Sequence, residues 1–211
     1  MTEKVQITIV GTGSIGTSIG LALRQSEEPL SIVGHDKDPR HAGTAKKLNA
    51  VDKTDWNLIG ACEKADIIIL AVPMTAIEET LRALAPNLKQ GCVITDTASL
   101  KGQVVGWADE LLPESVSFVG GNPVVVSNGS GPDAADADLF RDNLYCVTPG
   151  SNVHPDAVSL VTSLVALLGG QPYYLDPAEH DGLMAGVEDL PRVLALALAQ
   201  STMQESAWRE M

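Results

Sequence analysis

Glycines with the spacing of a phosphate-binding turn lie near the start of the chain. The segment Gly11–Gly16 reads G-T-G-S-I-G, follows the apolar run Val5–Val10, and leads into a helical pattern. A strand that enters G-x-G-x-x-G and then a helix is typical of dinucleotide binding. Gly11 would make the tight turn, Gly13 would let the backbone approach a pyrophosphate, and Gly16 would let the helix pack closely. The helix N-terminus, with Ser14 and Ile15, would face the phosphates. The alternative is a glycine turn without a cofactor.

An acidic residue follows the next apolar run. Leu30–His35 ends at Asp36, about 20 residues beyond the turn, where a carboxylate accepts hydrogen bonds from the adenosine ribose. A carboxylate there repels a 2′-phosphate, so NAD is favoured over NADP. Lys37 and Arg40 lie just downstream and could attract a phosphate, which keeps NADP as a second possibility.

Two further apolar runs end in polar or rigid residues at one edge of the predicted sheet. The run from Ala65 ends at Val72 and Pro73, as expected for a strand buried on both faces of a parallel sheet. Such strands end at the ligand crevice, so Val72 and Pro73 form either a wall for the nicotinamide ribose or a plain strand end. Ser99 follows the run Cys92–Asp96 and either caps the next helix or lies where cofactor and substrate meet.

Three other residues are expected near this edge of the predicted sheet. We expect Lys101 to be a solvated surface charge. Asn122 follows two glycines in the run Val116–Pro123 and reaches the crevice edge. His180 with Asp181 is either a structural pair, with the acid orienting the ring, or an acid–base group.

The elements that must position these residues alternate between strand and helix. Residues 1–176 are therefore predicted to form an α/β domain of the Rossmann type, with a doubly wound, mostly parallel sheet that binds NAD. The stretch Ser127–Asp138 is predicted to be a surface loop, and Gly169 with Gly170 is predicted to end a helix. From Pro177 onward only helical pattern remains, so residues 177–211 are expected to be a short helical segment, the truncated start of a helical domain.

Composition narrows the class of protein. The chain has 211 residues, 45% of them hydrophobic and 19% charged, which is typical of a globular protein. A net charge of −13 argues against nucleic acid or an anionic membrane as a partner. The three cysteines show no metal-binding or disulfide spacing, so we predict reduced, buried thiols and no metal site. No signal peptide or membrane-spanning run is recognisable, which makes the cytoplasm the expected location.

Several segments, in this order, resemble the prephenate and arogenate dehydrogenases of tyrosine biosynthesis. The resemblance covers nearly the whole chain and is carried by residues 11–16, 71–73, 96–101, 120–123, 138–140, 148–149, 168–170 and 180–181. It implies hydride transfer from the ring carbon bearing the substrate hydroxyl to the nicotinamide, with loss of carbon dioxide. It also implies that Ser99 lies near the nicotinamide and the substrate hydroxyl.

The chain departs from the family pattern at two places in its sequence. Asn122 stands where the family usually has a histidine that pairs with the substrate hydroxyl, and an amide cannot take up a proton. Residues 187–192 stand where the family commonly has a Ser-His-Leu-Pro-His segment, and neither histidine is present. The acids Glu188 and Asp189 add negative charge where a dicarboxylate should bind, and Arg192 could offset part of it.

The sequence leaves three functions open, and two of them are enzymes that act on a small-molecule substrate. The first is an NAD-dependent prephenate or arogenate dehydrogenase with Asn122, Ser99 and His180 in the catalytic site. The second is an NAD-dependent dehydrogenase for another hydroxy or keto compound, and the third is an NAD-binding regulatory protein. The apolar stripe of the last helix predicts a homodimer through the C-terminal helices.

Overall fold

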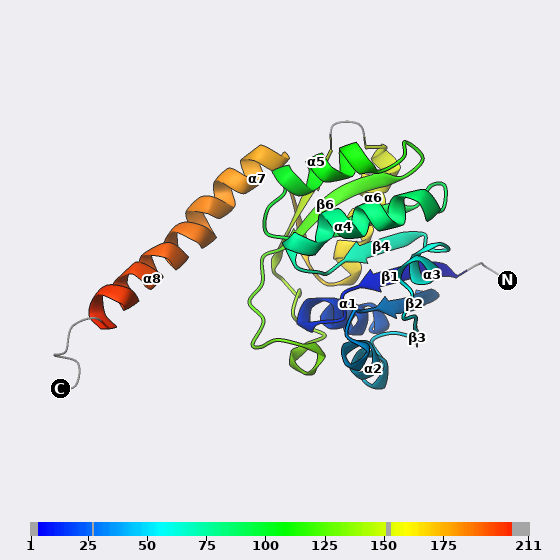
Figure 1. Ribbon diagram of the computed structural model, residues 1–211, viewed down its shortest axis with the longest axis horizontal. Helices are drawn as coiled ribbons and strands as arrows, with labels where there is room; N and C mark the ends of the chain where they lie inside the picture. The colour runs from blue at the N-terminus through cyan, green and yellow to red at the C-terminus, as the bar shows by residue number, and fades with distance from the viewer. Residues whose placement is uncertain (1–3, 27, 151–152, 204–211) are drawn as a thin grey trace.

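The computed structural model describes residues 4–26, 28–150 and 153–203, and these form one α/β body with a helical arm (Figure 1). Within this part of the chain the sheet order is β3-β2-β1-β4-β5-β6-β7-β8. The strands are β1 (Val5–Val10), β2 (Leu30–His35), β3 (Lys53–Thr54), β4 (Ile67–Leu70), β5 (Val93–Asp96), β6 (Ser117–Pro123), β7 (Leu144–Pro149) and β8 (Gln171–Tyr174). Neighbouring strands are parallel except β6 and β7, which are antiparallel. The predicted Rossmann-type, mostly parallel sheet is confirmed.

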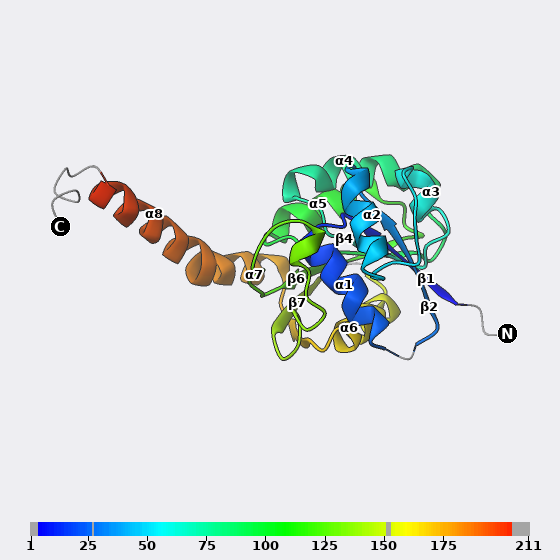
Figure 2. The ribbon, with the colours of Figure 1, turned by 90° about the horizontal axis from the view of Figure 1, so that it is seen from below.

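Helices cover both faces of the sheet (Figure 2). The α-helices are α1 (Ser14–Arg24), α2 (Pro39–Lys47), α3 (Leu58–Cys62), α4 (Met74–Leu84), α5 (Gly102–Leu111), α6 (Pro155–Leu167), α7 (Pro177–Met184) and α8 (Leu190–Met203). Short 3₁₀ turns are η1 (Ala85–Asn87) and η2 (Pro132–Ala134), and η3 (Ala185–Asp189) is a π-helical turn. Side chains of α1 and α6 join one hydrophobic core and those of α3, α4 and α5 join the other.

The central strands are apolar on both faces because they lie between these two cores. In β4, Ile67 and Ile69 belong to one core, whereas Ile68 and Leu70 belong to the other. A strand buried in this way has no polar face, which explains why the sequence shows a continuous apolar run rather than alternation.

The strand order reverses between β1 and β4, and this reversal positions the site. The chain goes from β1 to β2 on one side and later returns to β4 on the other side of β1. In open α/β sheets the ligand crevice lies at such a switch point, beyond the carboxyl ends of the strands. Gly11 follows β1, Asp36 follows β2 and Ala71 follows β4, so all three meet at this edge.

The three cysteines pack inside the body as free thiols, as the sequence predicts. Burial raises the pKa of Cys62 and of Cys92 to about 12. A thiol with such a pKa stays protonated and unreactive near neutral pH, so these side chains serve packing.

The arm consists of α7, η3 and α8 in one helical run that leaves the body (Figure 1). Asp176 caps α7 by accepting hydrogen bonds from the backbone N–H groups of Ala178 and Glu179. Pro191 is the second residue of α8, and the π-helical turn before this helix keeps the run continuous. Residues 204–211 of the predicted helical segment lie outside the described residues. No helix in the described part combines the length and apolarity of a bilayer span.

Candidate functional site

The glycine turn has the geometry that its spacing predicts. Gly11 has φ +93°, and a Cβ atom there would lie 2.4 Å from the carbonyl oxygen of Ala71. A Cβ atom at Gly16 would lie 1.9 Å from the carbonyl oxygen of Gly11. Packing therefore requires glycine at both positions. A Cβ atom at Gly13 would meet nothing within 4 Å, so that position opens onto free space.

Gly13 is the N-cap of α1, and it provides no capping side chain. The N–H groups in the first turn of a helix have no partner within the helix. At this helix N-terminus, an anionic ligand oxygen could accept hydrogen bonds from these N–H groups.

A pocket of about 520 Å³ opens at this turn. Among its lining residues are five of the predicted cofactor-binding residues: Gly11, Gly13, Asp36, Val72 and Pro73. Three others, Ser14, Ile15 and Gly16, lie in the first turn of α1, next to the pocket. Ile15 is half-buried against the core.

The Asp36 carboxylate lies directly at the turn. Its Oδ2 accepts a hydrogen bond of 2.7 Å from the backbone N–H of Thr12, and its Oδ1 accepts one of 2.8 Å from that of Asp38. These contacts fix the carboxylate at the pocket, within reach of a sugar bound there.

Arg40, which could have attracted a 2′-phosphate, is paired with Asp38. Its Nε and Nη2 atoms donate to the two carboxylate oxygens at 3.0 and 2.7 Å. The side-chain hydrogen bonds from Arg40 lower the pKa of Asp38 to about 2, so this pair is charged at neutral pH. An NADP phosphate would have to compete with Asp38 for the guanidinium.

The predicted surface loop Ser127–Asp138 packs over the start of α1. The hydroxyl of Ser127 is hydrogen-bonded to that of Ser14, and the backbone N–H of Asp136 donates to the Ser18 hydroxyl at 2.9 Å. The loop therefore lies against the N-terminal half of α1. Its composition gave no signal of this contact, because serines and glycines are common in any loop.

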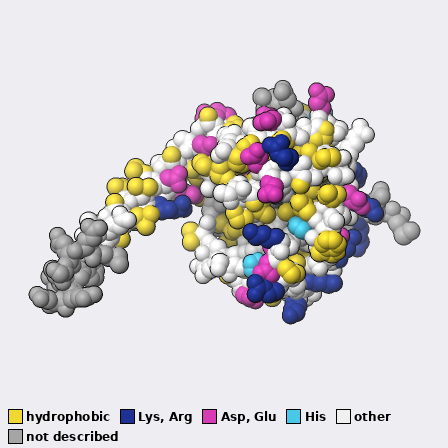
Figure 3. Space-filling view, in the orientation of Figure 1, with side chains coloured by type: hydrophobic (Ala, Val, Ile, Leu, Met, Phe, Trp, Pro, Cys, Tyr) yellow, Lys and Arg dark blue, Asp and Glu magenta, His cyan; other side chains and the backbone are white. Residues whose placement is uncertain are grey.

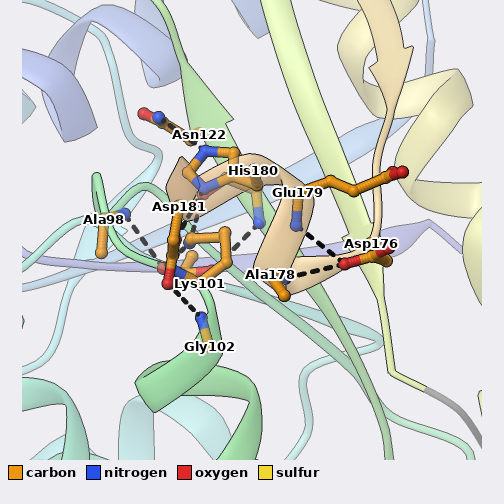
Figure 4. A network of polar contacts seen from close by, with 11 residues as sticks. Ala98, Lys101, Gly102, Asn122, Asp176, Ala178, Glu179, His180 and Asp181 are labelled. Carbon is orange, nitrogen blue, oxygen red and sulfur yellow. Dashed lines mark hydrogen bonds and ion pairs between the residues drawn. The ribbon is translucent and has the colours of Figure 1, made fainter. Parts of the chain in front are cut away.

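A second polar cluster joins Asn122, His180 and Asp181 (Figure 4). Asn122 Nδ2 lies 3.1 Å from His180 Nε2, and His180 Nδ1 lies 2.9 Å from an Asp181 oxygen. With the amide nitrogen donating to Nε2, Nδ1 is the ring atom that donates to Asp181. His180 is 0% and Asn122 4% exposed, so the contact between these two side chains is buried, whereas Asp181 is partly exposed.

Asp181 also binds the start of α5. It accepts hydrogen bonds from the backbone N–H groups of Lys101 and Gly102 at 2.7 and 2.9 Å. Burial alone would raise the pKa of Asp181, but the hydrogen bonds from His180 and from these two N–H groups outweigh it and lower the pKa.

Lys101 is not the surface charge that the sequence led us to expect. Its side chain is 0% exposed and forms an ion pair with Asp96, which is also 0% exposed. Burial lowers the pKa of Lys101, and the contact with Asp96 opposes this shift. The prediction was wrong because the stem of Lys101 turns inward beneath β6, toward a carboxylate at the end of β5.

Ser99 lies exposed in the loop between β5 and α5, two residues before Lys101. It does not cap α5, because the N-cap residue of that helix is Lys101 and the N–H groups of Lys101 and Gly102 are bonded to Asp181 instead. The capping alternative is therefore wrong, and Ser99 stays a candidate for the cofactor and substrate site.

Two glycines let β6 approach its neighbours just before Asn122. A Cβ atom at Gly120 would lie 2.3 Å from Thr148 Oγ1, and one at Gly121 would lie 2.6 Å from the carbonyl oxygen of Asp96. A side chain at either position would force β6 or one of its neighbours to shift.

The acidic residues that depart from the family pattern lie on η3, in the arm. Glu188 is half-buried, and Asp189 is exposed with its Oδ1 3.7 Å from Arg192 Nη1. Arg192 thus offsets part of the local negative charge. Within the described residues, no group of three His, Cys, Asp or Glu side chains is arranged to hold a metal ion.

Comparison with known protein families shows which family the chain belongs to. The model of the prephenate dehydrogenase nucleotide-binding domain matches residues 19–174. The chain belongs to this family. The match begins after the glycine turn, at residue 19.

Known relatives agree with this membership. The prephenate dehydrogenase of Bacillus subtilis is 32% identical over 200 residues, which cover 94% of this chain and 54% of that protein. The cyclohexadienyl dehydrogenase of Zymomonas mobilis is 30% identical over 198 residues, which cover 94% of this chain and 67% of that protein. The chain spans about half the length of the relatives from B. subtilis and Lactococcus lactis.

Solved structures show the same fold. The prephenate dehydrogenase from Aquifex aeolicus in complex with hydroxyphenyl propionate and NAD+ has a TM-score of 0.90 at 27% identity, covering 97% of this chain and 71% of that one. The Synechocystis arogenate dehydrogenase has a TM-score of 0.85 at 30% identity, covering 96% and 70%.

Proposed function

We propose that this chain is an NAD-dependent dehydrogenase of the prephenate or arogenate type. The observation that carries the proposal is the pocket that brings Gly11, Gly13 and Asp36 together at the switch point of the sheet. Family membership and the names of the relatives support the choice of substrate. We assign cofactor binding to residues 1–176 and assign residues 177–211 to the start of a helical segment for dimerisation and substrate binding.

The residues of the pocket fit a dinucleotide. Open space at Gly13 and the first-turn N–H groups of α1 suit a pyrophosphate, with Ser14, Ile15 and Gly16 in that turn. Asp36 suits the hydroxyls of the adenosine ribose, and its charge, together with the pairing of Arg40 to Asp38, favours NAD over NADP. Val72 and Pro73 would form a wall beside the nicotinamide ribose, and bound NAD would supply the hydride acceptor.

At the substrate end, Ser99 and Asn122 would hold the hydroxyl that is oxidised. Because Nδ2 of Asn122 donates to His180, Oδ1 of Asn122 is the atom left to accept a hydrogen bond from that hydroxyl. His180, oriented by Asp181, would hold the Asn122 amide in this direction. An amide orients the hydroxyl but cannot remove its proton, and a positioned general base typically contributes about 10²–10⁴-fold to the rate.

Turnover assays test the proposal directly. Purified protein with NAD and either prephenate or arogenate should produce NADH, and no NADH with either substrate, where an authentic enzyme succeeds, would refute it. Asn122→His should raise turnover by about 10²-fold and add a pH dependence near a pKa of about 6.5. Asn87→His, at an exposed position in η1, serves as the matched control and should change neither.

The acids on η3 favour a second candidate, an NAD-dependent dehydrogenase for a less anionic hydroxy or keto compound. Glu188 and Asp189 add negative charge where a dicarboxylate would approach. NADH formation with neutral hydroxy compounds, but not with prephenate or arogenate, would favour this candidate. A third candidate, an NAD-sensing regulatory protein, predicts NAD binding by calorimetry without turnover in the wild type or in Asn122→His.

We further propose a homodimer formed through α7 and α8. Hydrophobic side chains line the arm (Figure 3), and Leu190, Leu194 and Leu198 are 55%, 60% and 66% exposed. A helix that is apolar on all sides is normally buried, and a second copy would bury α8. The cytoplasmic location stays a prediction that fractionation of cells would test.

A further inference from the structure

The buried pair of Asp96 and Lys101 has no part in the chemistry proposed above. Both side chains are 0% exposed and contact each other directly. A buried ion pair can often be replaced by apolar side chains of similar volume without loss of stability. Stability of the fold therefore does not by itself explain why a lysine occupies this place.

The pair holds both polar backbone atoms of Gly121. Lys101 Nζ donates a hydrogen bond of 2.7 Å to the Gly121 carbonyl, and the Gly121 N–H donates one of 3.0 Å to Asp96 Oδ1. Gly121 immediately precedes Asn122, so the position of the Gly121 backbone determines where the Asn122 side chain lies.

These contacts lie where the backbone pairing between β5 and β6 has ended. The last paired residues of these two strands are Thr95 and Val119. Beyond them, β6 is joined to β7 on its other side, where Asn122 is opposite Cys146. The two side chains therefore tie β5 to β6 in place of the missing backbone pairs.

Asp96 and Asp181 together hold the loop that carries Ser99, one at each end. Asp96 Oδ2 accepts a hydrogen bond of 2.9 Å from the Ala98 N–H at one end of the loop. At the other end, the Lys101 N–H donates to Asp181, which also accepts from His180. Figure 4 shows these contacts converging from β5, β6 and α7.

We propose that Asp96 and Lys101 form a positioning pair that fixes the Ser99 loop, Asn122 and His180 relative to one another. This inference rests on the proposed function, since it assigns the pair to the site where hydride transfer would occur. Neither side chain touches the substrate. The pair acts through Gly121 and through the loop, and it sets the separation of the residues that do.

The double variant Asp96→Asn/Lys101→Met tests the proposal, because it removes both charges at once and leaves no single charge buried. Its kcat should fall by about 10²-fold, the effect of a small misplacement of catalytic groups, with the KM for NAD within about threefold of the wild type. The control is Leu164→Ala in α6, which opens a cavity in the core away from the site. This control should lower the thermal midpoint but not kcat.

Nuclear magnetic resonance gives a readout that does not need turnover. The Nδ1 proton of His180 is buried against Asp181 and should give a downfield, slowly exchanging signal, assigned by its loss in His180→Gln. In the double variant this signal should shift or broaden, and in Leu164→Ala it should stay in place. An unchanged signal in the double variant, or a kcat loss equalled by Leu164→Ala, overturns the proposal. A wild-type protein without turnover would refute the proposed function, while the signal would still test the positioning.

Discussion

Gly11 and Gly13 in the first turn are glycines for different reasons, and single substitutions to alanine distinguish the two reasons. Gly11→Ala places a side chain at φ +93° and 2.4 Å from a carbonyl oxygen, so it should destabilise the fold by about 2–5 kcal/mol. Gly13→Ala meets no atom within 4 Å and should change stability by less than about 0.5 kcal/mol. If a pyrophosphate approaches there, Gly13→Ala should still weaken NAD binding about tenfold or more, roughly 1.4 kcal/mol.

Denaturant unfolding and calorimetric titration with NAD measure the two effects separately. Gly43→Ala is the control, because a Cβ atom at Gly43, inside α2, also meets nothing within 4 Å. It should stabilise the protein by about 0.5–1 kcal/mol and leave NAD affinity unchanged. Full NAD affinity in Gly13→Ala would contradict a phosphate site at this turn.

Asp181 gives a pH dependence whose sign follows from its hydrogen bonds. Its pKa is lower in the folded protein than the ordinary 3.8, so its contribution to stability is present above about pH 4 and is lost as the pH falls further. Asp181→Asn should therefore cost on the order of 1–3 kcal/mol at pH 7, and this cost should decrease as the pH falls below about 4. Denaturant unfolding of both proteins across this range measures the difference, and a cost that is constant with pH would contradict the assignment.

At the scale of elements, Gly169 shows how one backbone angle ends a helix. Gly169 follows α6 at φ +78°, and its N–H donates to the Ala166 carbonyl. A Cβ atom there would lie 3.5 Å from the nearest atom, so the left-handed conformation and not space is the constraint. Gly169→Ala should cost about 1 kcal/mol, and Gly169→Asn less, since asparagine adopts this conformation more readily. Unfolding midpoints measure both, and equal losses would argue against a conformational cause.

The elements that were predictable are those whose signal is local. Continuous apolar runs gave β4 and β5, and the glycine pair gave the end of α6. The antiparallel direction of β7 was not predictable, because an apolar run carries no information about strand direction. The burial of Lys101 was also hidden, since its partner Asp96 lies close by only after β5 and α5 have formed. The contact of Ser127 with Ser14 spans 113 residues and depends on how the loop folds back.

At the scale of the whole molecule, the two parts of the chain differ in how their apolar residues are covered. In the body, two cores fill the space between the sheet and its helices. In the arm, α8 contains one charged residue, Arg192, and its leucines lie more than half exposed. A surface this apolar is stabilised in water when a second surface of the same kind covers it. A two-fold arrangement satisfies this condition, because the same face then serves both copies.

The dimer prediction has a sharp test in charged substitutions on α8. Leu194→Glu with Leu198→Glu places two carboxylates on the helix, where burial against a second copy would be costly. Sedimentation velocity should show a dimer for the wild type and a monomer for this variant. NAD affinity should be unchanged, because α8 lies outside the cofactor pocket. Leu48→Glu, at a 41% exposed leucine beside α2, is the control and should stay dimeric. A monomeric wild type at micromolar concentration would contradict the prediction, as would a dimer that survives both glutamates. In either case α8 would need a different partner to cover its leucines.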